Sequence, residues 1–164
     1  MVSDAPTAAL TAPSLPAPAS GRFAAGEHRF PLRVYFEDTD LSGLVYHANY
    51  LRYMERARSD MLRIAGIGQR AALEEGEGVY AVTDLHIRYR RPARLDDDLT
   101  VISRVADVSA VTCSIHQTVM RGEEILTQGD VSVAFLTPQG RPRRQPKPWT
   151  DIFIRLMRGE DIHP

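Results

Sequence analysis

Hydrophobic positions along the chain first indicate one long helix. From about residue 48, apolar side chains recur at the three- and four-residue spacing of a buried helix face: Tyr50, Met54, Ala57, Met61 and Ile64. Charged residues such as Arg52 and Arg63 fall between them, on the positions expected to face solvent. Gly66 and Gly68 follow the last apolar position and predict the end of this helix.

The rest of the pattern predicts strands, because apolar and polar residues alternate with a period of two. Strands are predicted over residues 28–36, 79–89, 99–105 and 111–119, and a last one runs to about residue 137. Over residues 79–89 one face is predicted to carry Val79, Ala81, Thr83, Leu85, Ile87 and Tyr89. Hairpin-length links join the later strands, so we expect an α+β fold, an antiparallel sheet of about five strands wrapped around one long central helix.

The two ends of the chain differ in composition from this central part. Residues 1–27 are rich in Ala and Pro and are predicted to be a disordered extension. Residues 28–158 form the predicted domain, within which residues 149–157 are expected to be a short amphipathic helix. Residues 159–164 are predicted to be a tail.

Composition narrows the classes of function. The 20 basic and 21 acidic residues give a formal charge of -1, so a nucleic-acid partner is not expected. No segment approaches the about 18 uninterrupted apolar residues of a membrane span. The single cysteine, Cys113, excludes an internal disulfide framework, fits a reducing compartment and is expected to be a core residue. These features predict a cytoplasmic protein without a transmembrane segment.

Three carboxylates precede the long helix. Glu37, Asp38 and Asp40 lie within a loop that reaches the predicted helix start in about ten residues. The first N–H groups of a helix have no internal partner, and they can stabilise a carbonyl oxygen that becomes negative. A neighbouring carboxylate can attack that carbonyl or activate a water, so acyl transfer is a candidate chemistry. On spacing alone, a solvated turn or a helix cap is the commoner explanation of such a loop.

The wider sequence resembles a known enzyme family. The similarity rests on Glu37-Asp38-Thr39-Asp40, Val45-Tyr46-His47-Ala48-Asn49-Tyr50, Glu55-Arg56-Ala57-Arg58 and Pro92-Ala93-Arg94-Leu95-Asp96-Asp97, together with Tyr35, Gly43 and Tyr89. These segments resemble the 4-hydroxybenzoyl-CoA thioesterase family, especially its bacterial branch of acyl-CoA thioesterases associated with the Tol-Pal system, the YbgC type. The resemblance spans about residues 32–137 and implies the hotdog fold.

The resemblance implies roles for individual residues. Asp40 would be the catalytic carboxylate, and His47 would supply a main-chain N–H to the thioester carbonyl while its side chain lies in the same site. Gly43, Tyr46, Asn49 and Tyr50 are candidate substrate-binding residues, although capping for Asn49 and packing for the tyrosines are the simpler interpretations. Phe36 departs from the family pattern, which commonly has a tyrosine there, and this difference bears on substrate preference.

Glu55 is the reserve catalytic candidate, because some hotdog thioesterases carry their carboxylate on the helix. A structural ion pair with a neighbouring arginine is the favoured role for it. The other histidines do not have the spacing of a helical zinc site, so we expect neither a metal nor a cofactor.

The resemblance therefore implies hydrolysis of acyl-CoA to free acid and CoA by a homodimer or a dimer of dimers, a homotetramer, in lipid metabolism. Acyl carrier protein is a possible further partner, and basic clusters near the pocket would suit the phosphates of CoA. Two other functions stay open. A 3-hydroxyacyl-thioester dehydratase or hydratase would use Asp40 and His47 for proton transfer, and a non-catalytic protein would only bind acyl thioesters.

Overall fold

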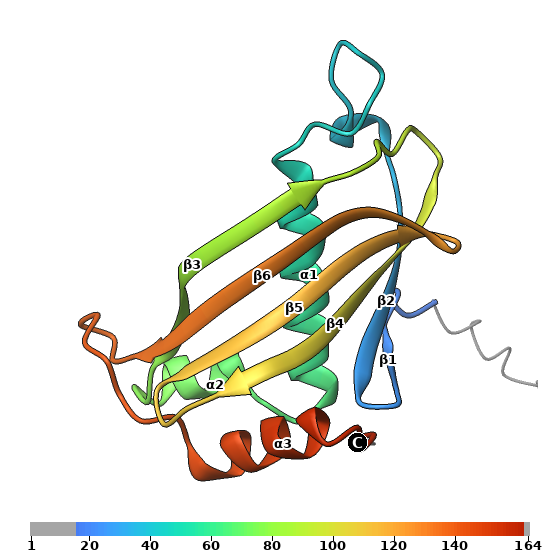
Figure 1. Ribbon diagram of the computed structural model, residues 1–164. Helices are drawn as coiled ribbons and strands as arrows, with labels where there is room; N and C mark the ends of the chain where they lie inside the picture. Colours follow the sequence, from blue (N-terminus) through green and yellow to red (C-terminus); the bar gives the residue numbers. More distant parts are fainter. Residues whose placement is uncertain (1–15, 163–164) are drawn as a thin grey trace, which may run out of the picture.

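An antiparallel sheet and one helix across it organise the chain. The computed structural model describes residues 16–162 (Figure 1). The strands are β1 (Arg22–Ala24), β2 (Glu27–Arg33), β3 (Val79–Tyr89), β4 (Asp98–Val108), β5 (Thr112–Arg121) and β6 (Glu124–Leu136), in the spatial order β1-β2-β4-β5-β6-β3. The helices are η1 (Phe36–Asp38, a single 3₁₀ turn), α1 (Asn49–Ile64), α2 (Gln69–Glu74) and α3 (Lys147–Met157). The predicted α+β hotdog architecture is confirmed.

Helix α1 lies across one face of the sheet, as its apolar stripe predicts. Tyr50, Met54, Ala57 and Met61 are all buried against the strands. Burying each of the larger side chains contributes roughly 1.5–3 kcal/mol, and this contribution holds the helix to the sheet. The helix ends at Ile64, just before the glycine at position 66 adopts a φ of 79°.

The six-stranded sheet contains one strand more than predicted. Strand β1 lies inside the segment predicted to be a disordered extension. That prediction is therefore wrong for residues 22–27. The two-residue turn from β1 to β2 places Ala25 at φ 54° and Gly26 at φ 75°, the positive values of a tight hairpin. An alanine at such a position gives no turn signal in the sequence, so the hairpin was missed. Residues 1–15 of the predicted extension lie outside the described residues.

Two helical predictions also need adjustment. Helix α2 is not among the predicted elements, because the Glu- and Gly-rich sequence around it indicates a connection, but six residues form a short helix there. The predicted amphipathic helix over residues 149–157 is present as α3 and begins two residues earlier. The tail after it is not separate from the domain, because Ile162 is buried in the same apolar cluster as Phe153. Residues 163–164 lie outside the described part.

Strand β3 contains a bulge that changes which side chains share a face. Val82 pairs with Val133 and Asp84 with Ser132, so Thr83 is left between the two pairs. The uniform alternation predicted for this strand is therefore wrong in its first half. Tyr80 and Val82, paired with Phe135 and Val133, lie on the helix side of the sheet together with Leu85, Ile87 and Tyr89. Strand β3 thus presents a continuous apolar strip toward the side of the sheet that carries α1.

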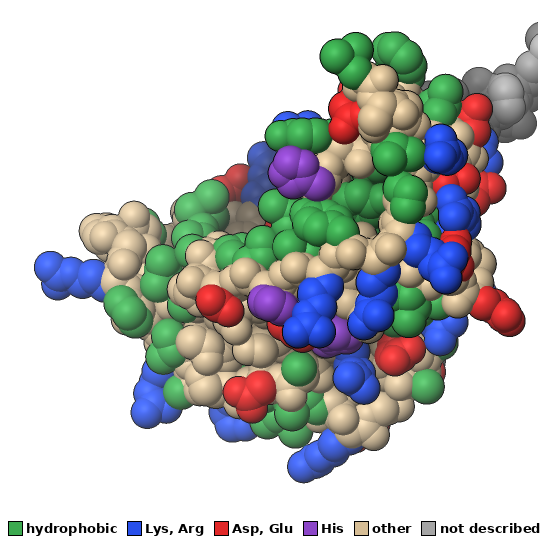
Figure 2. Space-filling model, turned by 45° about the horizontal axis from the view of Figure 1, so that its top comes forward, with side chains coloured by type: hydrophobic (Ala, Val, Ile, Leu, Met, Phe, Trp, Pro, Cys, Tyr) green, Lys and Arg blue, Asp and Glu red, His purple; other side chains and the backbone are tan. Residues whose placement is uncertain are grey.

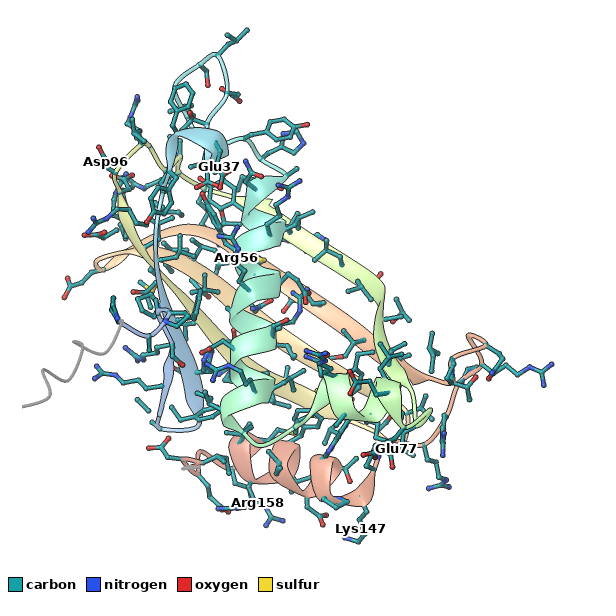
Figure 3. All side chains as sticks on the ribbon, turned by 180° about the vertical axis from the view of Figure 1, so that it is seen from behind. Glu37, Arg56, Glu77, Asp96, Lys147 and Arg158 are labelled. Atoms are coloured by element: carbon teal, nitrogen blue, oxygen red, sulfur yellow. The ribbon has the colours of Figure 1, made fainter. Side chains whose placement is uncertain are left out.

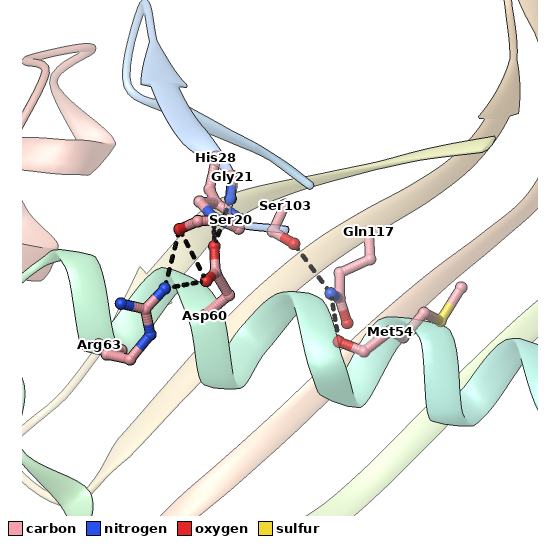
Figure 4. Close-up of polar contacts among 8 residues, drawn as sticks. All are labelled: Ser20, Gly21, His28, Met54, Asp60, Arg63, Ser103 and Gln117. Carbon is pink, nitrogen blue, oxygen red and sulfur yellow. Dashed lines mark hydrogen bonds and ion pairs between the residues drawn. The ribbon is translucent and has the colours of Figure 1, made fainter. Parts of the chain in front are cut away.

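Polar contacts cross the core beneath α1. The side chain of Gln117 on β5 is fully buried, and its Nε2 donates to the main-chain carbonyl of Met54 and to Ser103 Oγ, both at 2.9 Å (Figure 4). Its Oε1 accepts a hydrogen bond from Arg58 Nη1 at 2.7 Å. A buried amide with all these partners avoids the cost of an unpaired polar group and fixes the helix in one register on the sheet. On the same strand Cys113 is buried as predicted, and burial raises the pKa of its thiol to about 12.

A second polar cluster attaches the N-terminal segment to α1. The buried Asp60 carboxylate accepts hydrogen bonds from the Gly21 N–H at 2.7 Å, from Ser20 Oγ at 3.1 Å and from Arg63 Nη2 at 2.5 Å (Figure 4). Its Oδ2 also lies 2.9 Å from Nε2 of His28, which is 0% exposed. Burial lowers the pKa of His28, and this effect outweighs the attraction of Asp60.

This cluster predicts a loss of stability in mild acid. The pKa of His28 is lower in the folded protein than its ordinary value of 6.5, so the unfolded chain binds more protons between the two values. Its stabilising contribution is therefore complete above pH 6.5 and is lost as the pH falls below that value. The His28→Gln variant should show a weaker fall in unfolding free energy with acidification, by up to about 1.4 kcal/mol per pH unit.

The measurement is urea unfolding at several pH values on both sides of 6.5, the ordinary pKa of the histidine in the unfolded chain. His116→Gln is the control, because His116 pairs with Asp130 on the surface of the sheet. An unchanged pH slope in His28→Gln would contradict the assignment.

Candidate active site

A small hairpin carries the predicted catalytic carboxylate. Thr39 forms an isolated bridge with Val45, and the Asp40 N–H donates to the Leu44 carbonyl at 3.0 Å. Gly43 closes the turn, with its N–H 2.9 Å from the Asp40 carbonyl and a φ of 75°. Glycine adopts this positive φ without strain, which explains its place at the turn.

The base of this hairpin is tied to the start of α1. The main-chain carbonyl of Asp38 accepts hydrogen bonds from the Tyr46 N–H at 2.9 Å and from Asn49 Nδ2 at 2.8 Å. The buried Asp38 carboxylate accepts one from the Tyr35 N–H at 2.8 Å, and the buried Tyr53 hydroxyl lies beside it. Asp38 is thus the structural carboxylate of the three in the loop. The predicted helix cap at Asn49 is wrong, because its side chain anchors the loop, and Ala48 is the N-terminal cap residue.

The Asp40 carboxylate faces solvent on this hairpin. Its Oδ1 accepts hydrogen bonds from both the N–H and the hydroxyl of Ser42, while no partner is found for Oδ2 among residues 16–162. These hydrogen bonds, with a smaller contribution from His47, hold the pKa of Asp40 below its ordinary value. Asp40 is therefore ionised at neutral pH, with one oxygen available to a reactant.

His47 lies between this hairpin and the first turn of α1. The main-chain carbonyl of His47 accepts a hydrogen bond from the Tyr89 hydroxyl at 3.0 Å, and the His47 ring stands 4.5 Å from that of Tyr46. In the described part of the chain, no acceptor is found for the His47 main-chain N–H and no side chain caps α1. The Asn49 and Leu51 N–H groups donate to the Tyr46 and Ala48 carbonyls, so the His47 N–H is the one available to a developing oxyanion, beside the positive end of the helix dipole.

A cavity of about 320 Å³ opens beside His47. Its wall consists of Leu44, Val45, His47, Tyr50, Tyr89, Arg90, Arg91 and Pro92. Figure 2 shows one histidine among hydrophobic side chains at the rim of a hollow, whereas the sheet surface below carries histidines among charged groups. The cavity is mostly apolar with a basic rim, as expected for an apolar chain joined to a phosphorylated carrier.

The remaining candidates take different places. Tyr50 contributes its ring to the cavity, while its hydroxyl oxygen accepts a hydrogen bond from the Ala93 N–H at 2.9 Å. Tyr46 and Asp40 are exposed and do not line this cavity within the single chain. Phe36 is also exposed and has no recorded contact with Asp40.

Glu55 is remote from the His47 cavity. It forms an ion pair with Arg58 and accepts a hydrogen bond from Ser59 Oγ at 3.1 Å, which supports the structural role favoured for it. Figure 3 shows α1 from the side that faces away from the sheet, with Arg56 labelled on the helix next to Glu55 in the sequence.

Comparison with known proteins decides the family. Residues 34–153 match the thioesterase-like superfamily. The chain belongs to this superfamily. This thioesterase is 44% identical over 105 residues to the acyl-CoA thioesterase YbgC of Haemophilus influenzae, a match covering 64% of this chain and 77% of the relative. It is 36% identical over 121 residues to the acyl-CoA thioester hydrolase YbgC of Escherichia coli O157:H7, covering 73% and 90%. The predicted YbgC type and the predicted enzyme class, a thioester hydrolase, are confirmed.

Solved structures agree with the fold. A probable thioesterase from Bartonella henselae is 36% identical and superposes with a TM-score of 0.70, covering 73% of this chain and 99% of the other. A thioesterase from Thermus thermophilus, solved with coenzyme A and Zn, is 27% identical with a TM-score of 0.68, covering 79% and 92%.

Sequence reasoning missed three contributors to the site of this thioesterase. Ser42 polarises the Asp40 carboxylate, Asp38 anchors the loop, and Tyr89 holds the His47 peptide. Tyr89 belongs to the conspicuous motif, but its contact with His47 joins residues 42 positions apart, which no local pattern indicates.

The Tyr89 contact can be tested by removing a single hydroxyl. Tyr89→Phe should lower kcat/KM for an acyl-CoA thioester by about 5- to 10-fold, because about 1 kcal/mol of hydrogen bonding would no longer orient the His47 peptide. Tyr35→Phe is a matched control, since Tyr35 is likewise exposed and its hydroxyl has no hydrogen-bond partner among the described residues. Equal kinetics for both variants would contradict the role of Tyr89.

Proposed function

We propose that this thioesterase hydrolyses acyl-CoA thioesters to free acid and CoA, with Asp40 as its catalytic carboxylate. The proposal rests on an ionised Asp40 with one free oxygen and, in the same segment, on the unpaired His47 N–H two residues before α1, which begins without a side-chain cap. The named activities of the Haemophilus influenzae and Escherichia coli relatives support the substrate class.

In the proposed reaction the thioester carbonyl oxygen accepts a hydrogen bond from the His47 main-chain N–H. Negative charge that develops on this oxygen is stabilised by the helix-start amides. Asp40 then acts in one of two ways. It attacks the carbonyl carbon, expelling CoA thiolate and forming a mixed anhydride that water hydrolyses, or it removes a proton from a water that attacks directly.

The cavity suits a substrate of this kind. Tyr50 contributes an apolar wall, and Gly43 and Tyr46 would contact the substrate from the hairpin side. Arg90 and Arg91 lie at the rim, where the negatively charged phosphates of CoA would pass. Asn49 acts indirectly, by holding the loop.

A second copy of the chain would complete the enzyme. Strand β3 is eleven residues long and lies at one edge of the sheet, whereas β1 at the other edge has three residues. On β3 the apolar residues Val82 and Leu85, which face the helix side of the sheet, are 52% and 39% exposed. A long apolar edge strand is a template for pairing with another strand, so a homodimer joined through β3 is proposed, with a dimer of dimers as the larger assembly.

The cellular setting is also a proposal. No helix within residues 16–162 has the length and apolarity to cross a membrane. The substrate class and the single buried cysteine are consistent with a cytoplasmic enzyme of lipid metabolism. Acyl carrier protein presents its acyl group on the same phosphopantetheine arm as CoA and is an alternative donor.

Replacing Asp40 tests the function directly. Asp40→Asn should lower kcat for acyl-CoA hydrolysis by at least about 100-fold, while binding of a non-hydrolysable acyl-CoA analogue stays within about twofold. The measurement combines thiol release with calorimetric titration. Glu37→Gln is the matched control, because Glu37 is an exposed carboxylate in the same loop.

Wild-type thiol release by Asp40→Asn would contradict the assigned role. Formation of an enoyl product without thiol would favour the dehydratase, and tight binding without either product would favour the non-catalytic function.

The dimer prediction requires only a mass measurement. Light scattering should give two or four times the chain mass of 18.3 kDa for the wild type. Leu85→Lys should shift it toward a single chain, because a charge would enter the paired strip. Ile125→Lys changes an exposed apolar residue at the start of β6 and should leave the assembly intact. A monomeric wild type would contradict the prediction.

A further inference from the structure

Two hollows lie at opposite ends of β3, on the side of the sheet that carries α1. The first is the His47 cavity, which contains Tyr89 at the end of the strand. The second is a narrow hollow of about 60 Å³ near the beginning of the strand, and we call it the start hollow. Its lining includes Tyr80 and Val82 of β3 and the buried Ile115 and Val133 of the sheet, and α1 contributes Leu62 together with the polar side chains of Glu55, Arg58 and Ser59.

Within one chain the His47 cavity lacks a wall. It is open to solvent along the free edge of β3, and Tyr89 beside it is half exposed. A thioester bound there would leave its acyl chain in water, which forfeits roughly 0.8 kcal/mol for each methylene that a wall would bury. Figure 1 shows that no other element of the described chain lies beyond β3 on this edge. The missing wall must therefore come from another molecule.

Antiparallel pairing of two β3 strands brings unlike ends together. In such a pair, residues near the beginning of one strand lie opposite residues near the end of the other. The start hollow of one copy would then adjoin the His47 cavity of its partner. Since both hollows lie on the same side of the sheet, they would join into one channel that crosses the subunit boundary, with its apolar wall on the sheet side and polar side chains of α1 opposite.

We propose that Val82 of the second copy forms the wall of the acyl channel and sets the length of acyl chain that each active site accepts. This inference rests on the proposed hydrolysis and on pairing through β3. The bulge at Thr83 is what places Val82 on the channel side, because it changes the alternation of the strand there. Tyr80 is fixed by a 2.6 Å hydrogen bond from its hydroxyl to Gln145, which leaves Val82 as the exposed and adjustable position.

A chain-length panel tests the wall. With acyl-CoA substrates from acetyl to palmitoyl, Val82→Phe should lower kcat/KM at least about tenfold for the longer chains that the wild type accepts, and leave acetyl-CoA little changed. Val82→Ala should shift the optimum toward longer chains, and it keeps the test valid if the larger side chain disturbs pairing. His86→Phe is the control, since His86 is exposed on the opposite face of the same strand. An unchanged chain-length profile in both Val82 variants would overturn the proposal.

Mixed dimers test whether Val82 acts across the interface. One copy carries Asp40→Asn with the native Val82, and the other carries Val82→Phe with the native Asp40, each with a different affinity tag. In the purified mixed dimer the intact Asp40 would face the native Val82 of its partner. It should therefore recover the wild-type chain-length profile at about half the wild-type rate per dimer. The shortened profile of Val82→Phe in the mixed dimer would show that Val82 acts within its own chain and would overturn the proposal.

Failure of the inference differs from failure of the proposed function. If the wild type releases no thiol from any acyl-CoA, the hydrolytic function is wrong and the channel with it. If the wild type is active and Asp40→Asn is not, the function stands, and the profiles of the Val82 variants and of the mixed dimer decide the inference separately.

Discussion

One helix of sixteen residues cannot cover a six-stranded sheet, and this mismatch shapes the molecule. Helix α1 packs mainly on β2, β4 and β5, where its apolar stripe is buried. On the outer strand β3, Val82, Leu85 and Tyr89 remain exposed on the same face. Apolar area left in water is unfavourable by about 25 cal/mol per Å², so covering this edge, as in the proposed dimer, would be favourable.

The position of α1 is set by polar contacts at three levels along its length. Its start is anchored through Asn49 to the Asp38 carbonyl, its middle through the Met54 carbonyl to Gln117, and its last turns through Asp60 to the N-terminal segment. Apolar packing alone tolerates sliding of a helix on a sheet, whereas a buried hydrogen bond is satisfied in only one register. These contacts therefore fix where the amides at the helix start point, which is the property that catalysis needs.

The two carboxylates at the site are distinguished by their surroundings. Asp38 is buried and occupied by its contacts with the loop, while Asp40 is exposed and kept ionised by Ser42. The electrostatic value of helix-start amides increases when water is excluded from them. In a single chain Asp40 and the cavity beside His47 remain open to water. The proposed association along β3 would therefore also exclude water from the site.

Local patterns in the sequence determined much of this protein. The apolar stripe from Tyr50 to Met61 predicts α1, and the alternation around Val131 predicts a strand of the sheet. The segment from Glu37 to Tyr50 identifies the family. Each of these signals depends only on residues close together in the sequence. Tertiary structure decided the rest. The contact between Tyr89 and His47 joins residues far apart in the chain, so no local pattern indicates it. The Ala25–Gly26 turn and the bulge at Thr83 depend on backbone conformations that alanine and threonine do not predict. Which carboxylate is buried and which is free follows from the same long-range packing, so only the folded chain separates Asp38 from Asp40.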